Sequence, residues 1–197
     1  MCGIIAAATD RSAGKLLIKG LHKMEYRGYD SAGIALHQET EIVHLRSLGK
    51  VKLLEERMIQ EKPKGKVGIA HTRWATHGKP SETNAHPHSS KGRVFIVHNG
   101  IIENYIEIKE ELSSEGYSFS SQTDSELIAH ILDYYLTKGQ NMIDAMFSLK
   151  QKLNGAYAIA VIDQHDSEKF YLVRNKSPLL IGVGDDAFYA ASDPLAI

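Results

Sequence analysis

The sequence has one cysteine and one tryptophan among its 197 residues, and it contains no long apolar run. A single cysteine excludes an internal disulfide framework and suits a reducing compartment. No stretch approaches the roughly 18 apolar residues that a membrane-spanning helix needs, and the first residues lack the regions of a signal peptide. We therefore expect a cytoplasmic protein with no membrane partner.

An excess of charge of one sign is also absent. The 23 Lys and Arg residues are balanced by 24 Asp and Glu residues, which gives a net charge of -1. Sequence-independent binding to nucleic acid requires a basic surface, so we expect no nucleic-acid partner. Repeats and Pro/Ser-rich linkers are missing as well, and the length fits one domain with a substantial core.

Apolar periodicity predicts strands in blocks, with helices grouped between them. We expect helices over 12–25, 101–116, 123–138 and 141–153. Thr123 and Glu126 have the spacing of a capping box, and Asn141 is a candidate N-cap. Strands are predicted at 3–8, 31–37, 41–47, 66–71, 93–98, 156–163, 169–175, 179–184 and 187–192. The connections are too short for regular βαβ alternation, so the pattern favours an α+β fold of stacked sheets covered by helices.

The cysteine stands at position 2. Removal of Met1 would place its thiol on the same residue as a free α-amine. The reference pKa is about 8.5 for the thiol and about 7.7–8.0 for the α-amine, so the amine can take the thiol proton near neutral pH. Cys2 would then supply both a nucleophile and a general base. The alternative is a small apolar residue at the start of a buried strand.

Two polar motifs follow predicted strands, where a rigid scaffold commonly places binding groups. The motif HTRWATHG (71–78) contains Arg73, whose planar guanidinium matches a carboxylate; a surface ion pair is the simpler alternative. The motif HNG (98–100) contains Asn99 and Gly100, whose side-chain amide and backbone N–H could donate to a developing oxyanion. An Asn-Gly pair is equally typical of a tight turn.

Asp124 and the histidines each allow more than one interpretation. Asp124 lies in the first turn of a predicted helix, where a carboxylate either complements the helix dipole or meets the ammonium group of a ligand. The ten histidines include HPH at 86–88, with His71 and His77 upstream. Their spacing matches neither HExxH nor the cysteine-containing zinc patterns, so we expect no metal site.

Together these motifs resemble a known family. MCGI at the start, EYRGYDSAG (25–33), HTRWATHG (71–78), NAHPH (84–88), HNGIIEN (98–104) and TDSE (123–126) occur in the order typical of the glutaminase domains of glutamine–fructose-6-phosphate aminotransferases, which are class II glutamine amidotransferases. The resemblance covers residues 1–197, which we expect to form a single type-2 glutamine amidotransferase domain truncated at its C-terminus. It implies the N-terminal-nucleophile hydrolase fold, a four-layer αββα sandwich of two antiparallel sheets.

The resemblance also implies an enzyme that hydrolyses L-glutamine to glutamate and ammonia without a cofactor. In that family pattern Cys2 is the nucleophile, and Asn99 and Gly100 form the oxyanion hole. Arg27 matches a supporting arginine beside the nucleophile. The implied substrate-binding residues comprise two charged partners of the substrate and a loop that closes over it: Arg73, Asp124, Trp74, Thr76 and His77.

The same resemblance implies partners outside this chain. In a parent protein, which we expect to be a homo-oligomer, a sugar-phosphate isomerase region would use the ammonia to convert fructose 6-phosphate into glucosamine 6-phosphate. Two alternatives stay open: a glutaminase domain that serves another ammonia acceptor, and a non-catalytic glutamine-binding sensor. The presence of Cys2, Asn99 and Arg73 together argues against the sensor.

Overall fold

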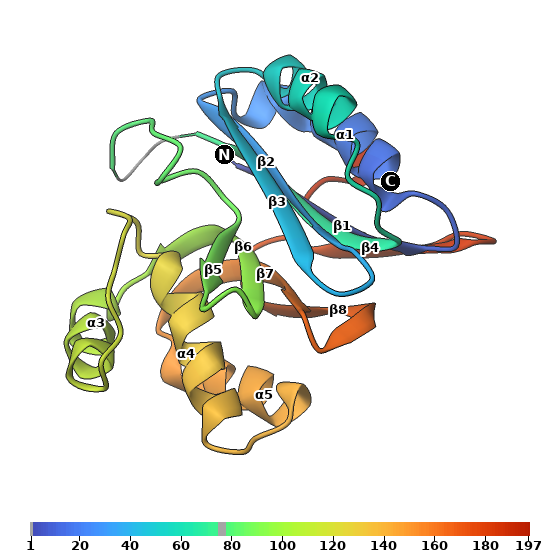
Figure 1. Cartoon of the computed structure of the whole chain (residues 1–197). Helices are drawn as coiled ribbons and strands as arrows, with labels where there is room; N and C mark the ends of the chain where they lie inside the picture. The colour runs from blue at the N-terminus through green and yellow to red at the C-terminus, as the bar shows by residue number, and fades with distance from the viewer. Residues whose placement is uncertain (1, 75–77) are drawn as a thin grey trace.

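Two antiparallel sheets pack face to face between two layers of helices in the computed structural model, which describes residues 2–74 and 78–197 (Figure 1). One sheet has the strand order β3 (Ile42–Leu48), β2 (Ser31–His37), β4 (Val67–Arg73), β1 (Gly3–Thr9), β10 (Ala187–Ala191) and β9 (Leu180–Val183). The other has the order β5 (His88–Ser90), β6 (Val94–Ile102), β7 (Gly155–Asp163) and β8 (Asp166–Asn175). This is the predicted αββα sandwich.

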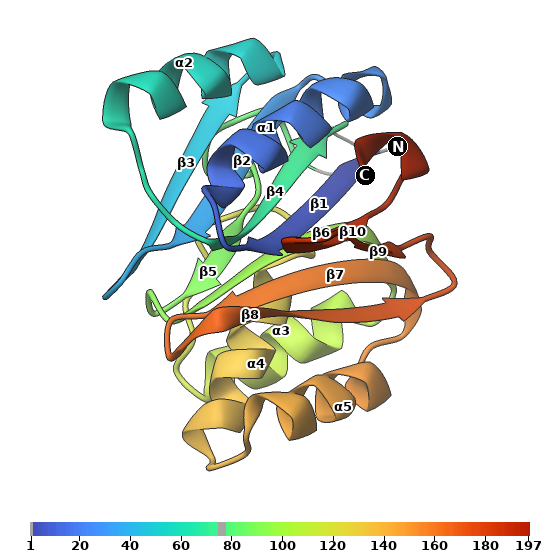
Figure 2. The ribbon, with the colours of Figure 1, turned by 90° about the vertical axis from the view of Figure 1, so that its right-hand side faces the viewer.

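The helices lie on the outer faces of the two sheets, as Figure 2 shows. The first sheet is covered by α1 (Ala13–Met24) and α2 (Val51–Glu61), and the second by α3 (Tyr105–Ser114), α4 (Glu126–Thr137) and α5 (Met142–Lys152). Short 3-10 turns span Glu25–Arg27 and Pro194–Ala196. No helix in the described part of the chain is long and apolar enough to cross a membrane.

The sandwich follows from strands that bury both of their faces. Successive side chains of a strand point to opposite sides of the sheet. In β1, Ile5 and Ala7 therefore pack under the helices α1 and α2, while Ile4 and Ala6 pack against the second sheet. The central strands must then be apolar at nearly every position, which is why they appear in the sequence as continuous apolar runs.

Most predicted elements are confirmed, but some details are wrong, and the short strand β5 was not predicted. All nine predicted strands are present, and Asn141 caps α5 by accepting a hydrogen bond from the Asp144 N–H at 3.0 Å. The capping box is wrong, because α4 begins at Glu126 and no side chain caps it. The helix predicted from residue 101 begins at Tyr105, since Ile101 belongs to β6. The helix α2 was not predicted, because only its residues Val51 and Leu54 are buried.

Replacement of Gly33 by alanine should destabilise the fold. A Cβ on Gly33, in the middle of β2, would lie 1.9 Å from the carbonyl oxygen of His86. Overpacking of this kind costs about 1–3 kcal/mol. We expect Gly33→Ala to lower the free energy of unfolding in urea by that amount. Gly184→Ala is the matched control, because its Cβ would have no neighbour closer than 3.4 Å; equal stability of the two variants would contradict the prediction.

Candidate active site

Cys2 lies directly before β1, at the point where that strand meets the end of β4. The register pairs Gly3 of β1 with Thr72 of β4, and this places Cys2 beside the backbone of Trp74. The Trp74 N–H donates a hydrogen bond to the Cys2 Sγ at 3.2 Å, and the Sγ lies 3.6 Å from the Trp74 carbonyl oxygen. Burial raises the pKa of the Cys2 thiol, while the contact with Trp74 and the charge of Arg73 oppose that rise.

Asn99 reaches Cys2 from the other sheet. Its Nδ2 donates a hydrogen bond to the carbonyl oxygen of Cys2 at 3.0 Å, and its Oδ1 lies 2.9 Å from the Nε2 of His71 in β4. Asn99 and Gly100 lie inside β6, opposite Ala158 and Tyr157 of β7. The tight turn considered for Asn-Gly is therefore wrong, and the motif lies within the strand instead of following it.

Gly100 occupies a position that other residues cannot easily fill. Its φ is 139°, and a Cβ there would lie 2.1 Å from the carbonyl oxygen of Ala156. Only glycine adopts such a φ at low cost. Gly100 is exposed and directly follows Asn99 in β6, so the side-chain amide of Asn99 and the backbone of Gly100 lie on neighbouring residues of one strand.

Arg73 and Asp124 bring opposite charges to the same end of the sandwich. Arg73 is the last residue of β4, is 5% exposed, and donates from Nη2 to the Gly78 carbonyl oxygen at 3.5 Å. Burial lowers the pKa of Arg73, and the charges of Cys2, Asp30 and Asp124 oppose that effect. Arg73 is thus a buried cation with the candidate nucleophile and two carboxylates in its surroundings.

Asp124 is fixed by the end of β6 and does not belong to the helix. Its Oδ2 accepts a hydrogen bond from the Ile102 N–H at 2.8 Å, and it lies two residues before the first residue of α4. The predicted position in the first helical turn is therefore wrong. Since Asn99, Gly100 and Ile102 share β6, the strand sets the spacing between the candidate oxyanion donors and the carboxylate.

Arg27 contacts the segment behind the first strand. Its Nη1 donates to the Asp193 Oδ2 at 2.7 Å and to the Ser192 carbonyl oxygen at 3.1 Å. The Ser192 hydroxyl in turn accepts a hydrogen bond from the Ile4 N–H at 2.9 Å. Arg27 is thus linked to the strand that carries Cys2, through the chain that follows β10.

Trp74 forms the exposed rim of the site. Its side chain is 43% exposed, and its ring meets the edge of the Tyr29 ring at a centroid distance of 5.4 Å and an angle of 77°. Two further predicted substrate-binding residues, Thr76 and His77, lie outside the described residues.

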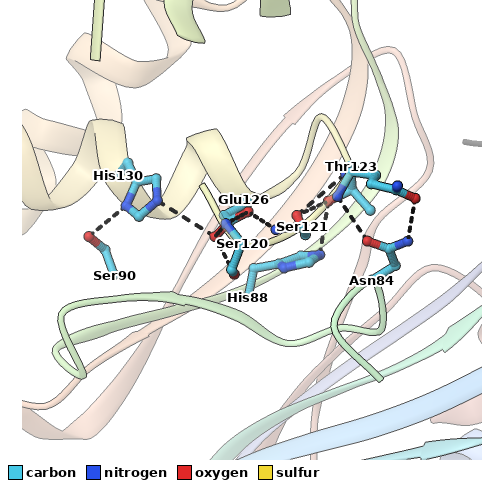
Figure 3. A network of polar contacts seen from close by, with 9 residues as sticks. Asn84, His88, Ser90, Ser120, Ser121, Thr123, Glu126 and His130 are labelled. Atoms are coloured by element: carbon cyan, nitrogen blue, oxygen red, sulfur yellow. Dashed lines mark hydrogen bonds and ion pairs between the residues drawn. The ribbon is translucent and has the colours of Figure 1, made fainter. Parts of the chain in front are cut away.

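A polar network holds the segment that precedes Asp124 (Figure 3). Glu126 accepts hydrogen bonds from the Ser120 N–H at 2.9 Å and from the Ser121 N–H at 2.6 Å. Burial disfavours ionisation of Glu126, but the neighbouring His130 ring and the hydrogen bonds from Ser120 and Ser121 outweigh it and hold the pKa of this carboxyl well below its usual range. Glu126 therefore holds the backbone of the loop at Ser120 and Ser121, and it does not take part in the predicted capping box.

The same network connects this loop to residues 84–90. The Asn84 Oδ1 accepts a hydrogen bond from the Gln122 N–H at 2.9 Å, and the Thr123 hydroxyl lies 3.1 Å from the His88 Nε2. Side-chain hydrogen bonds thus connect the segment 84–90 to the loop that carries Asp124. Sequence reasoning did not identify Glu126 or Asn84 as site residues, because their partners are distant in the sequence or in irregular loops.

Four histidines are buried in a cluster next to Asn99: His71, His86, His88 and His98. The rings of His71 and His86 stack at a centroid distance of 4.1 Å, and burial lowers the pKa of His71 and of His88 to about 3. Neutral rings in such surroundings serve as hydrogen-bonding groups. Among the described residues, no group of three or more His, Cys, Asp or Glu side chains could hold a metal ion.

A groove of about 1360 Å³ lies elsewhere, between α1, the end of α2 and the β2–β3 turn. Its basic lining residues are Arg11, Lys15, Lys19, Lys62, Lys64 and Lys66. None of the candidate site residues lines this groove, so its size alone does not make it the active site.

Comparison with known proteins identifies the class. Residues 71–197 match the family model described as glutamine amidotransferase domain. The fold matches the structure of glutamine phosphoribosylpyrophosphate amidotransferase from B. subtilis with a TM-score of 0.86 and 26% identity, over 99% of this chain and 42% of that one. The chain belongs to the glutamine amidotransferase domain family.

Within that class, the sequence relatives are glutamine–fructose-6-phosphate aminotransferases of the isomerizing type. The chain is 49% identical over 197 residues to the protein from Acinetobacter baylyi and 51% identical over 199 residues to that from Haemophilus influenzae. Each alignment covers the whole of this chain and 32% of the relative. The chain thus spans about a third of the length of these relatives.

Replacement of Glu126 by glutamine should loosen the loop that carries Asp124. A hydrogen bond to a charged group contributes about 1.5–3 kcal/mol to stability. We expect Glu126→Gln to lower the free energy of unfolding at pH 7, measured in urea, by at least that amount. The pKa of Glu126 is depressed in the folded state, so its contribution is present above the unfolded pKa of about 4.3 and is lost as the pH falls below it. The difference between wild type and Glu126→Gln should therefore shrink towards pH 3.

Glu110→Gln is the matched control, because Glu110 is exposed on α3. It should unfold like the wild type at both pH values. A difference for Glu126→Gln that stays constant from pH 7 to pH 3 would show that its carboxylate charge does not stabilise the loop.

Proposed function

We propose that this chain hydrolyses L-glutamine to L-glutamate and ammonia with Cys2 as the nucleophile. The observation that carries the proposal is that Asn99 and Trp74 both contact Cys2. The Asn99 Nδ2 donates to the Cys2 carbonyl oxygen at 3.0 Å, and the Trp74 N–H donates to the Cys2 Sγ at 3.2 Å. Cys2 becomes the first residue after removal of Met1, and its α-amine takes the thiol proton. The thiolate then attacks the side-chain amide carbon of glutamine.

The tetrahedral intermediate places a negative charge on the former amide oxygen. Asn99 and the N–H of Gly100 donate hydrogen bonds to this oxygen. The α-ammonium of Cys2 returns its proton to the leaving ammonia, and water then hydrolyses the thioester to release glutamate. One N–H of the Asn99 amide is held by Cys2 in the described structure, and its second N–H serves the oxyanion.

The charged residues recognise the other end of the substrate. Arg73 binds the α-carboxylate, whose planar shape fits a guanidinium fork. Asp124 binds the α-ammonium, and Trp74 covers the bound substrate together with Thr76 and His77. Arg27 supports β1 through its hydrogen bonds to Ser192 and Asp193. The position of Arg73 supports this assignment, because it is buried at the end of β4 with Cys2 and Asp124 among the charges that act on it.

In the parent protein the ammonia is destined for fructose 6-phosphate, which gives glucosamine 6-phosphate. The names of the relatives support this acceptor, and a sugar-phosphate isomerase region in their remaining length would carry out the second reaction. Residues 1–197 are the single glutamine amidotransferase domain of that protein. A chain that bound glutamine without hydrolysing it would instead be a sensor.

Asn99→Ala should separate catalysis from binding. Removal of one oxyanion donor reduces kcat by about 10²–10³, and we expect that loss with a KM for glutamine close to that of the wild type. Glutamate release in a coupled dehydrogenase assay measures both constants. Wild-type protein that binds glutamine in calorimetry but releases no glutamate would favour the sensor and overturn the proposed function.

An uncleavable residue placed before Cys2 tests the general base. It converts the α-amine into an amide that cannot accept a proton at neutral pH, while the thiol remains. We expect hydrolysis to fall at least about 10²-fold, the low end for loss of a positioned general base. Mass spectrometry verifies the extension and times the alkylation of Cys2 by an electrophilic glutamine analogue. Undiminished hydrolysis by the extended chain would mean that another group is the base.

A further inference from the structure

His71 makes a contact that fixes both its own protonation and the orientation of Asn99. The Nδ2 of Asn99 faces the Cys2 carbonyl oxygen, which can only accept a hydrogen bond. The other end of the amide is therefore the Oδ1, and it lies 2.9 Å from the Nε2 of His71. An oxygen there requires a donor, so the proton of His71 must be on Nε2.

The surroundings of His71 favour this neutral tautomer. Its side chain is 1% exposed, and its Nδ1 has no hydrogen-bond partner among the described residues. Burial of the ring disfavours its charged form and lowers the pKa of His71 to about 3. The neutral ring has one N–H, and that N–H is directed at Asn99.

The His86 ring also restrains the ring of His71. The two rings stack at an interplanar angle of 23°. The Nδ1 of His86 in turn accepts a hydrogen bond from the backbone N–H of His98 at 3.2 Å, next to Asn99 in β6. His71 is thus packed between the second sheet and the loop before β5, and its donor has little freedom to leave Asn99.

We propose that His71 is a positioning residue for Asn99: its Nε2–H holds the Asn99 Oδ1 and so directs the amide N–H groups towards Cys2. The inference rests on the proposed function, in which Asn99 donates to the oxyanion. Without this contact only the Cys2 carbonyl oxygen would oppose a 180° rotation of the amide, which would place the amide oxygen near that carbonyl and remove the donor from the oxyanion.

Kinetics of His71→Phe test this role. Phenylalanine keeps the flat ring against His86 and removes the donor. Misplacement of a catalytic group can cost about 10²-fold, so we expect kcat to fall about 10–100-fold while the KM for glutamine changes less than about 3-fold. His71→Gln carries an amide N–H near the position of the lost Nε2–H and should recover part of kcat.

A double-mutant cycle separates positioning from general damage. In an Asn99→Ala background there is no amide to orient, so His71→Phe should change kcat less than about 2-fold. The control is His37→Phe, which removes a buried ring that contacts the Gln164 carbonyl oxygen at 2.9 Å, away from Cys2. It should lower the melting temperature without lowering kcat. An equal fall of kcat for His71→Phe in both backgrounds, or no fall in either, would overturn the inference.

Nitrogen-15 NMR of labelled histidines gives a readout that does not depend on activity. At pH 7, His71, assigned through His71→Gln, should show a protonated Nε2 and an unprotonated Nδ1. The opposite tautomer would overturn the inference even if the chain hydrolyses glutamine. If the wild type shows the Nε2–H tautomer but releases no glutamate, the proposed function fails while the contact stands.

Discussion

The hydrogen bond between the Asn99 amide and the Cys2 carbonyl oxygen connects the two sheets at the site, and the other features depend on it. Cys2 precedes the first strand, so no regular pairing holds it. Its position is set instead by Asn99 of β6 and by the backbone of Trp74 after β4. The candidate nucleophile is thereby fixed by groups from both sheets, although residues near the end of a chain are ordinarily the least ordered.

This connection demands that backbones approach closely, and glycines permit it at two positions. Because Gly33 has no side chain, the carbonyl oxygen of His86 can contact the backbone of the first sheet, and the His86 ring stacks on His71. Gly100 lets β6 pass the carbonyl of Ala156 with a φ that other residues avoid. Gly33 belongs to the motif EYRGYDSAG and Gly100 to HNGIIEN, and their steric roles explain why these motifs have glycine at those positions.

Much of the fold could be predicted from the sequence, because strands buried on both faces are short continuous apolar runs bounded by polar and turn residues. The missed helix α2 buries only Val51 and Leu54, so its apolar stripe is too weak to recognise. The extension of β6 through Asn99 and Gly100 was hidden by residues that are typical of turns. The pairing with β7 overrides that local preference, which is a tertiary effect that no short window contains.

The candidate site was predictable as a set of residues but not as an arrangement. Cys2 directly precedes β1, Arg73 ends β4, Asn99 lies within β6, and Asp124 accepts a hydrogen bond from Ile102 of that strand. The motifs predict these four as site residues, and that assignment stays a prediction. The partners that hold them are different: His71 is 28 residues from Asn99, and Glu126 binds Ser120 and Ser121 in an irregular loop. These contacts depend on strand register and loop path, which become known only once both sheets are built.

The electrostatics of the site favour a zwitterionic ligand over a singly charged one. Arg73 is buried beside Asp30 and Asp124, and the adjacent histidines are held neutral by burial, so they add no further positive charge. A ligand with one carboxylate and one ammonium group can contact Arg73 and Asp124 together without changing the net charge around them. An anion without an ammonium group would be repelled by the carboxylates of Asp30 and Asp124, and a cation without a carboxylate would be repelled by the guanidinium of Arg73. Under the proposed function, this charge arrangement suits the α-amino-acid end of glutamine, and the uncharged side-chain amide is the part that reaches Cys2.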